Sequence, residues 1–123
     1  MPTSQHAAKV LVVDDDQDIR DALCELLEDA GYSSAAASNG KEALTYLSDD
    51  GHRPCVILLD LMMPVMDGWE FRRQQMNDPK LSGIPVVVIT AAGKDGASSI
   101  AAERVLPKPL QLEHVLEALR QYC

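Results

Sequence analysis

Short apolar runs alternate with segments of helical periodicity along the chain, and this alternation sets the fold class. Five runs are expected to form strands, namely residues 9–13, 32–38, 54–60, 85–90 and 104–106. Each is followed by a segment that is expected to be helical, namely residues 17–30, 41–47, 68–76, 91–103 and 112–119. The fourth of these segments is small and polar and has room for only a short helix. The alternation predicts an α/β domain in which helices cover both faces of a parallel sheet.

The run at residues 56–59 is apolar at every position and ends abruptly at Asp60. A short apolar run that is bounded by turn residues predicts a strand buried on both faces. The predicted strand order is 2-1-3-4-5, a common order of doubly wound sheets, which puts strands 1 and 3 side by side. The polar residues that follow the strands then meet at one edge of the sheet, and they are Asp14, Asp15, Asp60, Thr90 and Lys108.

Composition and charge exclude several classes of protein. The net charge of −8 argues against a surface that binds nucleic acid or an anionic membrane. No segment approaches the roughly 18 apolar residues that a membrane-spanning helix needs, and the start does not read as a signal peptide. The three cysteines are scattered without a CxxC pair, so we expect reduced thiols and a cytoplasmic protein. Residues 1–8 are expected to be a flexible tail, and residues 9–123 one domain.

The predicted cluster of polar residues contains the components of a phosphoryl-transfer site. The carboxylates of Asp14, Asp15 and Asp60 would repel one another unless a hard divalent cation such as Mg2+ bound between them. Lys108 would add a positive charge and Thr90 a hydroxyl donor beside a carboxylate nucleophile. The sequence contains neither a P-loop motif nor a GxGxxG motif, so a nucleotide substrate is not expected.

Residues near the predicted helices receive structural interpretations. Asp16 is expected to cap the helix that follows it, because a carboxylate at a helix N-terminus accepts from free backbone N–H groups. Asp67 is interpreted as a loop or cap residue. Arg72 and Arg73 are expected to lie on a solvated helix face.

The chain resembles response-regulator receiver domains over nearly its whole length. The resemblance rests on motif blocks in the family's order and at near-family spacing, namely residues 11–16 (LVVDDD), 59–68 (LDLMMPVMDG), 85–91 (PVVVITA) and 108–109 (KP). Each block alone would be a weak signal, whereas the ordered set is highly specific. It implies the flavodoxin-like form of the doubly wound (βα)5 fold and a function as the phosphoacceptor module of a two-component phosphorelay.

The resemblance also implies a role for each matching residue. Asp60 would be the phosphoacceptor and would take a phosphoryl group from the phosphohistidine of a sensor histidine kinase or a phosphotransfer protein. Mg2+ would be bound directly by Asp15, Asp60 and the backbone carbonyl of Met62, and through water by Asp14. The phosphorylated domain would then change its contacts with a downstream protein.

Two further residues have implied roles beside the phosphoacceptor. Lys108 would contact the phosphoryl oxygens, and its peptide bond to Pro109 would be cis. Thr90 would turn toward the phosphoryl group and report its arrival. The domain would not be a conventional enzyme, because it would catalyse only the phosphorylation and dephosphorylation of its own aspartate.

Two features depart from the family pattern. Val105 stands where the family usually carries Tyr or Phe, and a valine cannot make the inward movement of that aromatic ring. The segment between Thr90 and Lys108 is about one helical turn shorter than usual, which removes most of a fourth helix. We therefore expect the phosphorylation chemistry to be retained and the signal to pass through a remodelled or more mobile region, since Gly93 and Gly96 fall there.

Two other functions compete with this interpretation. An aspartate-nucleophile phosphohydrolase of the haloacid dehalogenase type would use Asp14, because such enzymes place DxD after their first strand. However, Asp18 stands where they carry Thr or Val, and the chain has no room for a cap domain. A binding module that cannot be phosphorylated is opposed by the intact set of Asp60, Thr90 and Lys108. The substitution Asp60→Asn separates the phosphoacceptor module from the phosphohydrolase, because the phosphohydrolase would still carry phosphate on Asp14.

Overall fold

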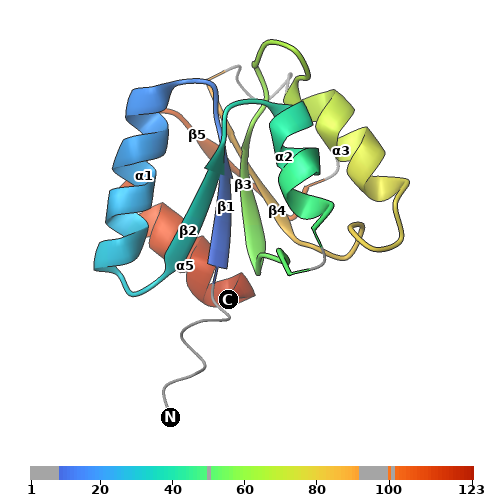
Figure 1. Cartoon of the computed structure of the whole chain (residues 1–123). Coiled ribbons are helices and arrows are strands. Elements are labelled where there is room, and N and C mark those ends of the chain that lie inside the picture. The colour runs from blue at the N-terminus through green and yellow to red at the C-terminus, as the bar shows by residue number, and fades with distance from the viewer. Residues whose placement is uncertain (1–8, 50, 92–99, 101) are drawn as a thin grey trace.

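The computed structural model describes residues 9–49, 51–91, 100 and 102–123 of the chain (Figure 1). The predicted tail at residues 1–8 lies outside the described residues. So do Gly93, Gly96 and most of the segment that was expected to hold a short fourth helix. The expectations for these residues therefore stay predictions.

Five parallel strands form one sheet in the order β2-β1-β3-β4-β5, which confirms the predicted fold class and strand order. The strands are β1 (Lys9–Val13), β2 (Ser33–Ala37), β3 (Val56–Asp60), β4 (Val86–Thr90) and β5 (Arg104–Pro107). Every residue of β3 and β4 is buried. Their sequences are continuously apolar up to the last residue because both faces of the central sheet are covered.

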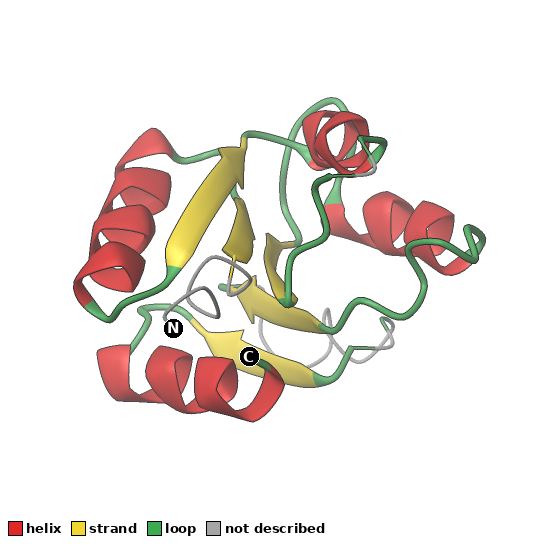
Figure 2. Cartoon of the chain, turned by 60° about the horizontal axis from the view of Figure 1, so that its bottom comes forward, coloured by secondary structure: helices red, strands yellow, loops and turns green. Residues whose placement is uncertain are grey.

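Helices lie on both faces of the sheet (Figures 1 and 2). The helices α1 (Gln17–Asp29) and α5 (Leu112–Tyr122) cover one face, and α2 (Gly40–Leu47) and α3 (Gly68–Met76) cover the other. No helix in the described part of the chain is long and apolar enough to cross a membrane.

The core consists of two apolar layers, one on each face of the sheet. Successive residues of a strand point to opposite faces, so Val13 of β1 packs in the layer that contains Phe71 of α3. Val12 packs in the other layer, with Leu27 of α1 and Leu119 of α5. Full burial of side chains of this size stabilises the fold by about 1.5–3 kcal/mol each. The central strands are therefore held rigidly from both sides.

Side chains cap three of the four helices found among the described residues at their N-termini. The Asp16 carboxylate accepts hydrogen bonds from the backbone N–H groups of Asp18 and Ile19, which confirms its predicted role. Asn39 and Asp67 cap α2 and α3 in the same way. Each such cap stabilises a helix by about 1 kcal/mol. The caps fix where α1 and α3 begin, and both helices begin next to the polar edge of the sheet.

The expectation that Arg72 lies on a solvated face is wrong, whereas Arg73 is exposed. Nη1 of Arg72 donates to Oε1 of Gln75 at 2.8 Å, and Nη2 lies 3.6 Å from Oε1 of Glu103. The same Glu103 oxygen accepts from the backbone N–H of Val86 at the start of β4. These partners let a charged side chain be buried, because an ion pair with further hydrogen bonds offsets the cost of removing it from water.

The expectation of three reduced thiols is also wrong for two of the cysteines. Cys55 and Cys123 form a disulfide whose Cα atoms lie 5.4 Å apart, whereas Cys24 is a free cysteine. Cys55 immediately precedes β3, and Cys123 follows the last residue of α5. The bond therefore joins the start of the central strand to the end of the last helix.

Candidate phosphoryl-transfer site

The register of the two central strands brings two carboxylates to the same edge of the sheet. Val13, the last residue of β1, pairs with Leu59 of β3, so Asp14 and Asp60 follow at the same level. Both aspartates are buried, with 2% and 5% of their surfaces exposed. The apolar strands behind them leave little freedom to either side chain. The predicted convergence of these two residues is confirmed.

The other half of this edge comes from β4 and β5. Thr90 ends β4 and is buried, and its partner in β5 is Pro107, directly before Lys108. The backbone N–H of Lys108 donates to the Thr90 carbonyl at 3.1 Å, which extends the pairing by one residue. The peptide bond between Lys108 and Pro109 is cis, as the family resemblance implied.

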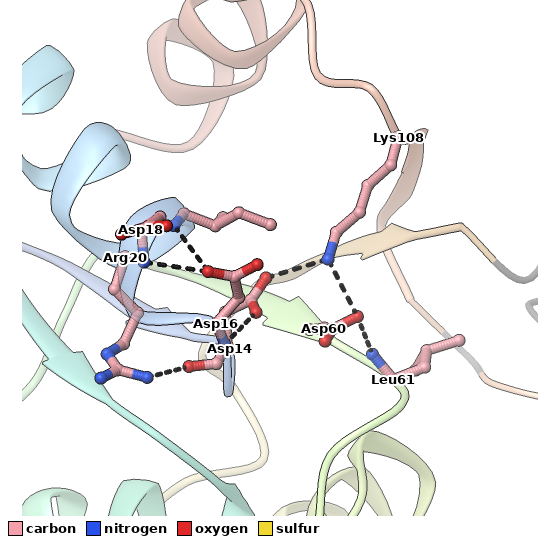
Figure 3. A network of polar contacts seen from close by, with 8 residues as sticks. Asp14, Asp16, Asp18, Arg20, Asp60, Leu61 and Lys108 are labelled. Atoms are coloured by element: carbon pink, nitrogen blue, oxygen red, sulfur yellow. Dashed lines mark hydrogen bonds and ion pairs between the residues drawn. The ribbon is translucent and has the colours of Figure 1, made fainter.

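Lys108 extends from the loop after β5 to both buried carboxylates (Figure 3). Its Nζ lies 3.1 Å from Oδ2 of Asp14 and 3.6 Å from Oδ1 of Asp60. Burial lowers the pKa of the Lys108 ammonium. The hydrogen bond to Asp14 and the charge of Asp60 more than offset this effect, so the pKa lies above its ordinary value. Lys108 is therefore a fixed positive charge at neutral pH.

The electrostatics around Asp60 oppose its ionisation. Burial, and after it the negative charge of Asp14, raise the pKa of Asp60 to about 6, although Lys108 and the N–H of Leu61 act in the opposite direction. At pH 7 the carboxylate is still mostly ionised. Its Oδ1 accepts from the Leu61 N–H at 2.9 Å and faces Lys108. Among the described residues, both of these contacts are made by Oδ1, so Oδ2 is the oxygen available as a nucleophile or ligand.

The loop after β1 is held in shape by Arg20, a residue that the sequence analysis did not single out. Nη1 of Arg20 donates to the carbonyl oxygen of Asp14 at 2.7 Å (Figure 3). The side chain of Asp14 in turn accepts from the N–H of Asp16 through Oδ1, while its Oδ2 contacts Lys108. Both oxygens of Asp14 are thus engaged, which disfavours Asp14 as the nucleophile of a phosphohydrolase. The sequence carries no clear signal for this contact, because Asp14 precedes α1 and a separation of six residues does not match the helical spacing of three or four.

The loop after β3 contains the residues that fix the backbone of Asp60. The N–H of Gly68 donates to the Leu61 carbonyl at 2.9 Å, and a Cβ atom at Gly68 would lie 2.6 Å from the carbonyl oxygen of Asp60. Only glycine allows the start of α3 to approach this closely. Val65 has a φ of 68° and an exposed side chain. A β-branched residue rarely adopts this left-handed conformation, so the loop is locally strained.

The carboxylates at this edge fit a divalent cation. Asp14, Asp15 and Asp60 each offer an oxygen, and these oxygens lie within 4.8 Å of one another. Asp15 is exposed, so the cluster opens to solvent on its side. Hard oxygen donors with this charge suit Mg2+ or a similar ion. The remaining candidate, Met62, follows in the loop after β3 with an exposed side chain.

The residue that departs from the family pattern lies outside this cluster. Val105 is in β5, next to Leu106, which packs in the core, and 42% of its surface is exposed. Its neighbour on the other side, Arg104, forms an ion pair with Glu117 of α5. The exposed side chain of Val105 therefore lies on the outer surface of an edge strand.

An apolar cleft adjoins the lysine. Its volume is about 630 Å3, and it lies between α1 and the start of α5. The residues that line it are Ile19, Ala22, Leu23, Leu26, Lys108, Pro109, Leu110, Leu112 and Val115. The cleft therefore continues from the charged cluster onto the surface of α1.

Comparisons with known proteins agree with this geometry. The family model for the response regulator receiver domain matches residues 10–120. The response regulator MprA of Mycolicibacterium vanbaalenii is 38% identical over 118 residues, which cover 91% of this chain and 48% of that protein. MprA of Mycobacterium tuberculosis H37Rv is 38% identical over 120 residues, which cover 93% of this chain and 50% of that protein. The chain thus spans about half the length of these relatives.

Solved structures give the same result. The chemotaxis response regulator CheY4 of Vibrio cholerae superposes with a TM-score of 0.83 at 33% identity, covering 94% of this chain and 98% of that one. The signal receiver domain of a signal transduction histidine kinase from Syntrophus aciditrophicus superposes with a TM-score of 0.86 at 28% identity, covering 94% of this chain and 89% of that one.

Proposed function

Because the chain belongs to the response regulator receiver domain family of two-component systems, we propose that Asp60 is its phosphoacceptor. The observation that carries this proposal is the setting of Asp60 at the tip of β3. The carboxylate is nearly buried, its Oδ1 is fixed by the Leu61 N–H, and a lysine ammonium lies 3.6 Å away. A nucleophile that is held still beside a positive charge is suited to attack an electron-rich phosphoryl group.

The proposed reaction is a phosphoryl transfer from nitrogen to oxygen. Oδ2 of the ionised Asp60 attacks phosphorus, the P–N bond of a phosphohistidine breaks, and its electron pair returns to the imidazole nitrogen. The product is an acyl phosphate on Asp60. Because the pKa of Asp60 is about 6, the nucleophilic form predominates at neutral pH and declines below it.

Other residues of the cluster stabilise the charge that moves to this site. Asp15, Asp60 and the Met62 carbonyl would hold Mg2+ directly and Asp14 through water. The metal, when bound, neutralises charge on the phosphoryl oxygens. Lys108 pairs with a phosphoryl oxygen. The Thr90 hydroxyl, at the same edge of the sheet, donates to another phosphoryl oxygen and so senses the modification.

Incubation with acetyl phosphate and Mg2+, followed by intact mass and peptide mapping, tests the proposal. We expect one added phosphoryl group on the peptide that contains Asp60. The variant Asp60→Asn should remain unmodified, and Asp14→Asn should fold but react slowly. No phosphoryl group on Asp60, or transfer onto Asp14 in the Asp60→Asn variant, would overturn the assignment.

We further propose that the protein phosphodonor, a sensor histidine kinase or a phosphotransfer protein, docks on the apolar cleft beside Lys108. The cleft begins at the lysine and runs along α1, so a donor seated there can reach Asp60. The exposed face of α1 carries Asp18, Asp21 and Glu25, which favours a partner with basic residues around its apolar contact.

A pair of variants separates docking from chemistry. Ala22→Asp places a charge in the cleft and should slow transfer from a histidine-phosphorylated donor while leaving transfer from acetyl phosphate unchanged. Thr45→Asp adds the same charge on the exposed surface of α2 and should slow neither reaction. Equal rates for Ala22→Asp and Thr45→Asp with the protein donor would contradict the docking site.

We also propose the remaining features of the signalling module. Residues 9–123 form the receiver domain, residues 1–8 form a tail, and the protein acts in the cytoplasm. Phosphorylation changes its contacts with a downstream protein. The family membership and the acidic charge of the chain support these proposals, and fractionation of cells that express the tagged protein tests the location.

A further inference from the structure

We propose that Cys55 and Cys123 form a reversible redox site. Their disulfide would form and break by exchange with small thiols and disulfides, as a second covalent modification of the domain. The two cysteines come from distant parts of the chain, with a sequence separation of 68 residues, and the fold brings their Cα atoms to 5.4 Å. This inference does not depend on the chemistry proposed for Asp60. It concerns the opposite end of the same strand, because Cys55 directly precedes β3 and Asp60 ends it.

The backbone around both cysteines is fixed by other interactions. The N–H of Cys55 donates to the Lys9 carbonyl at 2.9 Å, which places this residue in register with β1. The N–H of Cys123 donates to the Leu119 carbonyl at 2.7 Å and closes the last turn of α5. Leu119 is buried in the core. The thiols are thus brought together by the fold itself, and the bond is not needed to assemble the two segments.

The same geometry accommodates the reduced pair. Sγ of Cys55 lies 3.3 Å from the Lys9 carbonyl oxygen. A disulfide sulfur has no proton to donate, but the thiol that reduction creates can donate to this oxygen. Cys55 is half-buried, so a satisfied thiol there is stable. Both redox states therefore have a favourable local structure.

Unequal exposure determines the order of the exchange steps. Cys123 is exposed and Cys55 is half-buried, so an incoming thiolate attacks Sγ of Cys123. The sulfur–sulfur bond breaks, Cys55 leaves as a thiolate that takes up a proton, and a mixed disulfide forms at Cys123. A second reagent thiolate then attacks the reagent's sulfur, a reagent disulfide forms, and Cys123 leaves as a thiolate that takes up a proton. In the reverse direction two protein thiols and one disulfide reagent yield the cross-link and two reagent thiols.

The location gives the site a specific effect. The cross-link fastens the last turn of α5, whose helix forms one wall of the apolar cleft through Leu112 and Val115. Reduction removes this attachment, so the C-terminal turn of α5 opens more often. Disulfides of cytoplasmic proteins are usually transient and follow the redox state of the compartment. The cytoplasmic location proposed above therefore suits a reversible bond.

The full chain, equilibrated in glutathione buffers of increasing oxidised fraction, tests the redox site. Acid quenching, alkylation and peptide mapping then report the linkage. We expect an intrachain Cys55–Cys123 bond that increases with oxidised glutathione and is lost with dithiothreitol. Cys24→Ser should behave as the parent chain, and Cys123→Ser should lose the bond. A bond that never forms, that persists at every ratio, or that includes Cys24 would overturn the proposal.

Hydrogen exchange on the oxidised and reduced parent chain tests the effect on α5 without any substitution. We expect faster exchange in residues 119–122 after reduction and no change in β3. Equal exchange in the two states would refute the effect on the helix. The variant Asp60→Asn should show the same redox response, so a failure of the proposed phosphorylation and a failure of this site are distinguishable.

Discussion

The substitution Gly68→Ala tests how closely the start of α3 must approach the end of β3, which carries the proposed phosphoacceptor Asp60. A Cβ atom at this position would lie 2.6 Å from the carbonyl oxygen of Asp60, and 2.8 Å from both Cα and Cδ2 of Leu61. Two of these three atoms belong to the backbone, which cannot move aside as the end of a flexible side chain can. The new methyl group must therefore displace either α3 or the end of β3.

The expected cost follows from two opposing effects. Overpacking of this kind costs about 1–3 kcal/mol, and backbone contacts put Gly68→Ala in the upper part of that range. Replacing glycine in a helix returns about 0.5–1 kcal/mol. The net loss is about 1–2 kcal/mol. With about 2.1 cal/mol/K of unfolding entropy per residue, a chain of 123 residues loses about 4 °C in Tm per kcal/mol, so we expect a loss of about 4–8 °C.

Thermal unfolding and the rate of phosphorylation by acetyl phosphate measure the two consequences. The matched control is Gly51→Ala, where the added Cβ would lie 3.5 Å from an oxygen of Asp49, an ordinary contact. Its Tm should change by no more than about 2 °C. Gly68→Ala should also slow phosphorylation, because either displacement disturbs the contact between the start of α3 and the backbone that carries Asp60. A variant that matches Gly51→Ala in Tm and the parent chain in rate would refute the reasoning.

Three further substitutions test individual parts of the site by urea unfolding. Folding raises the pKa of Asp60 to about 6, so the folded state favours the protonated carboxyl. The stability that this protonation contributes is fully present below about pH 4 and is lost as the pH rises through 6. With divalent ions removed by a chelator, the free energy of unfolding of Asp60→Asn should therefore exceed that of the parent chain at pH 8 by about 1–2 kcal/mol, allowing for solvent screening. The difference should vanish near pH 4. A difference that stays constant with pH would contradict the raised pKa of Asp60. The free energy of unfolding of Val65→Asn should be about 1 kcal/mol higher than that of the parent chain, because asparagine tolerates a φ of 68° and the valine is exposed. An unchanged free energy would show that the loop is not strained. The free energy of unfolding of Arg20→Ala should fall by about 1–2 kcal/mol, because the hydrogen bond to the Asp14 carbonyl is lost. Arg20→Lys should recover part of this loss. Equal losses in both variants would contradict a role of the side-chain charge in this loop.

The fold and the meeting of the polar residues could be predicted because they depend on local patterns. An apolar run that ends in Asp60 predicts both a buried strand and the level at which its carboxylate lies. Parallel strands then bring Asp14 and Lys108 to the same edge, as the structure confirms. The alternation alone allows more than one strand order, and the order 2-1-3-4-5 was predicted with the help of the family resemblance.

The features that sequence reasoning missed depend on partners far away in the chain. Arg72 is buried because Glu103, near the start of β5, supplies an opposite charge, and helical periodicity contains no information about that residue. The spacing of Cys55 and Cys123 likewise gives no pairing signal, since only the packing of α5 against the sheet brings them together. The left-handed backbone of Val65 was missed because a β-branched side chain predicts the opposite conformation.

The ammonium of Lys108 does not fully neutralise the carboxylates of the proposed phosphoacceptor site. Three carboxylates and one ammonium amount to two uncompensated negative charges at neutral pH. A phosphoryl dianion is repelled by such a cluster, whereas a single divalent ion makes it neutral. The carboxylate oxygens lie within 4.8 Å of one another, well inside the Debye length of about 8 Å at physiological ionic strength. Monovalent salt should therefore be a poor substitute for a divalent ion. If Asp60 is the phosphoacceptor, as proposed, the concentration of that ion limits how readily the domain can be phosphorylated.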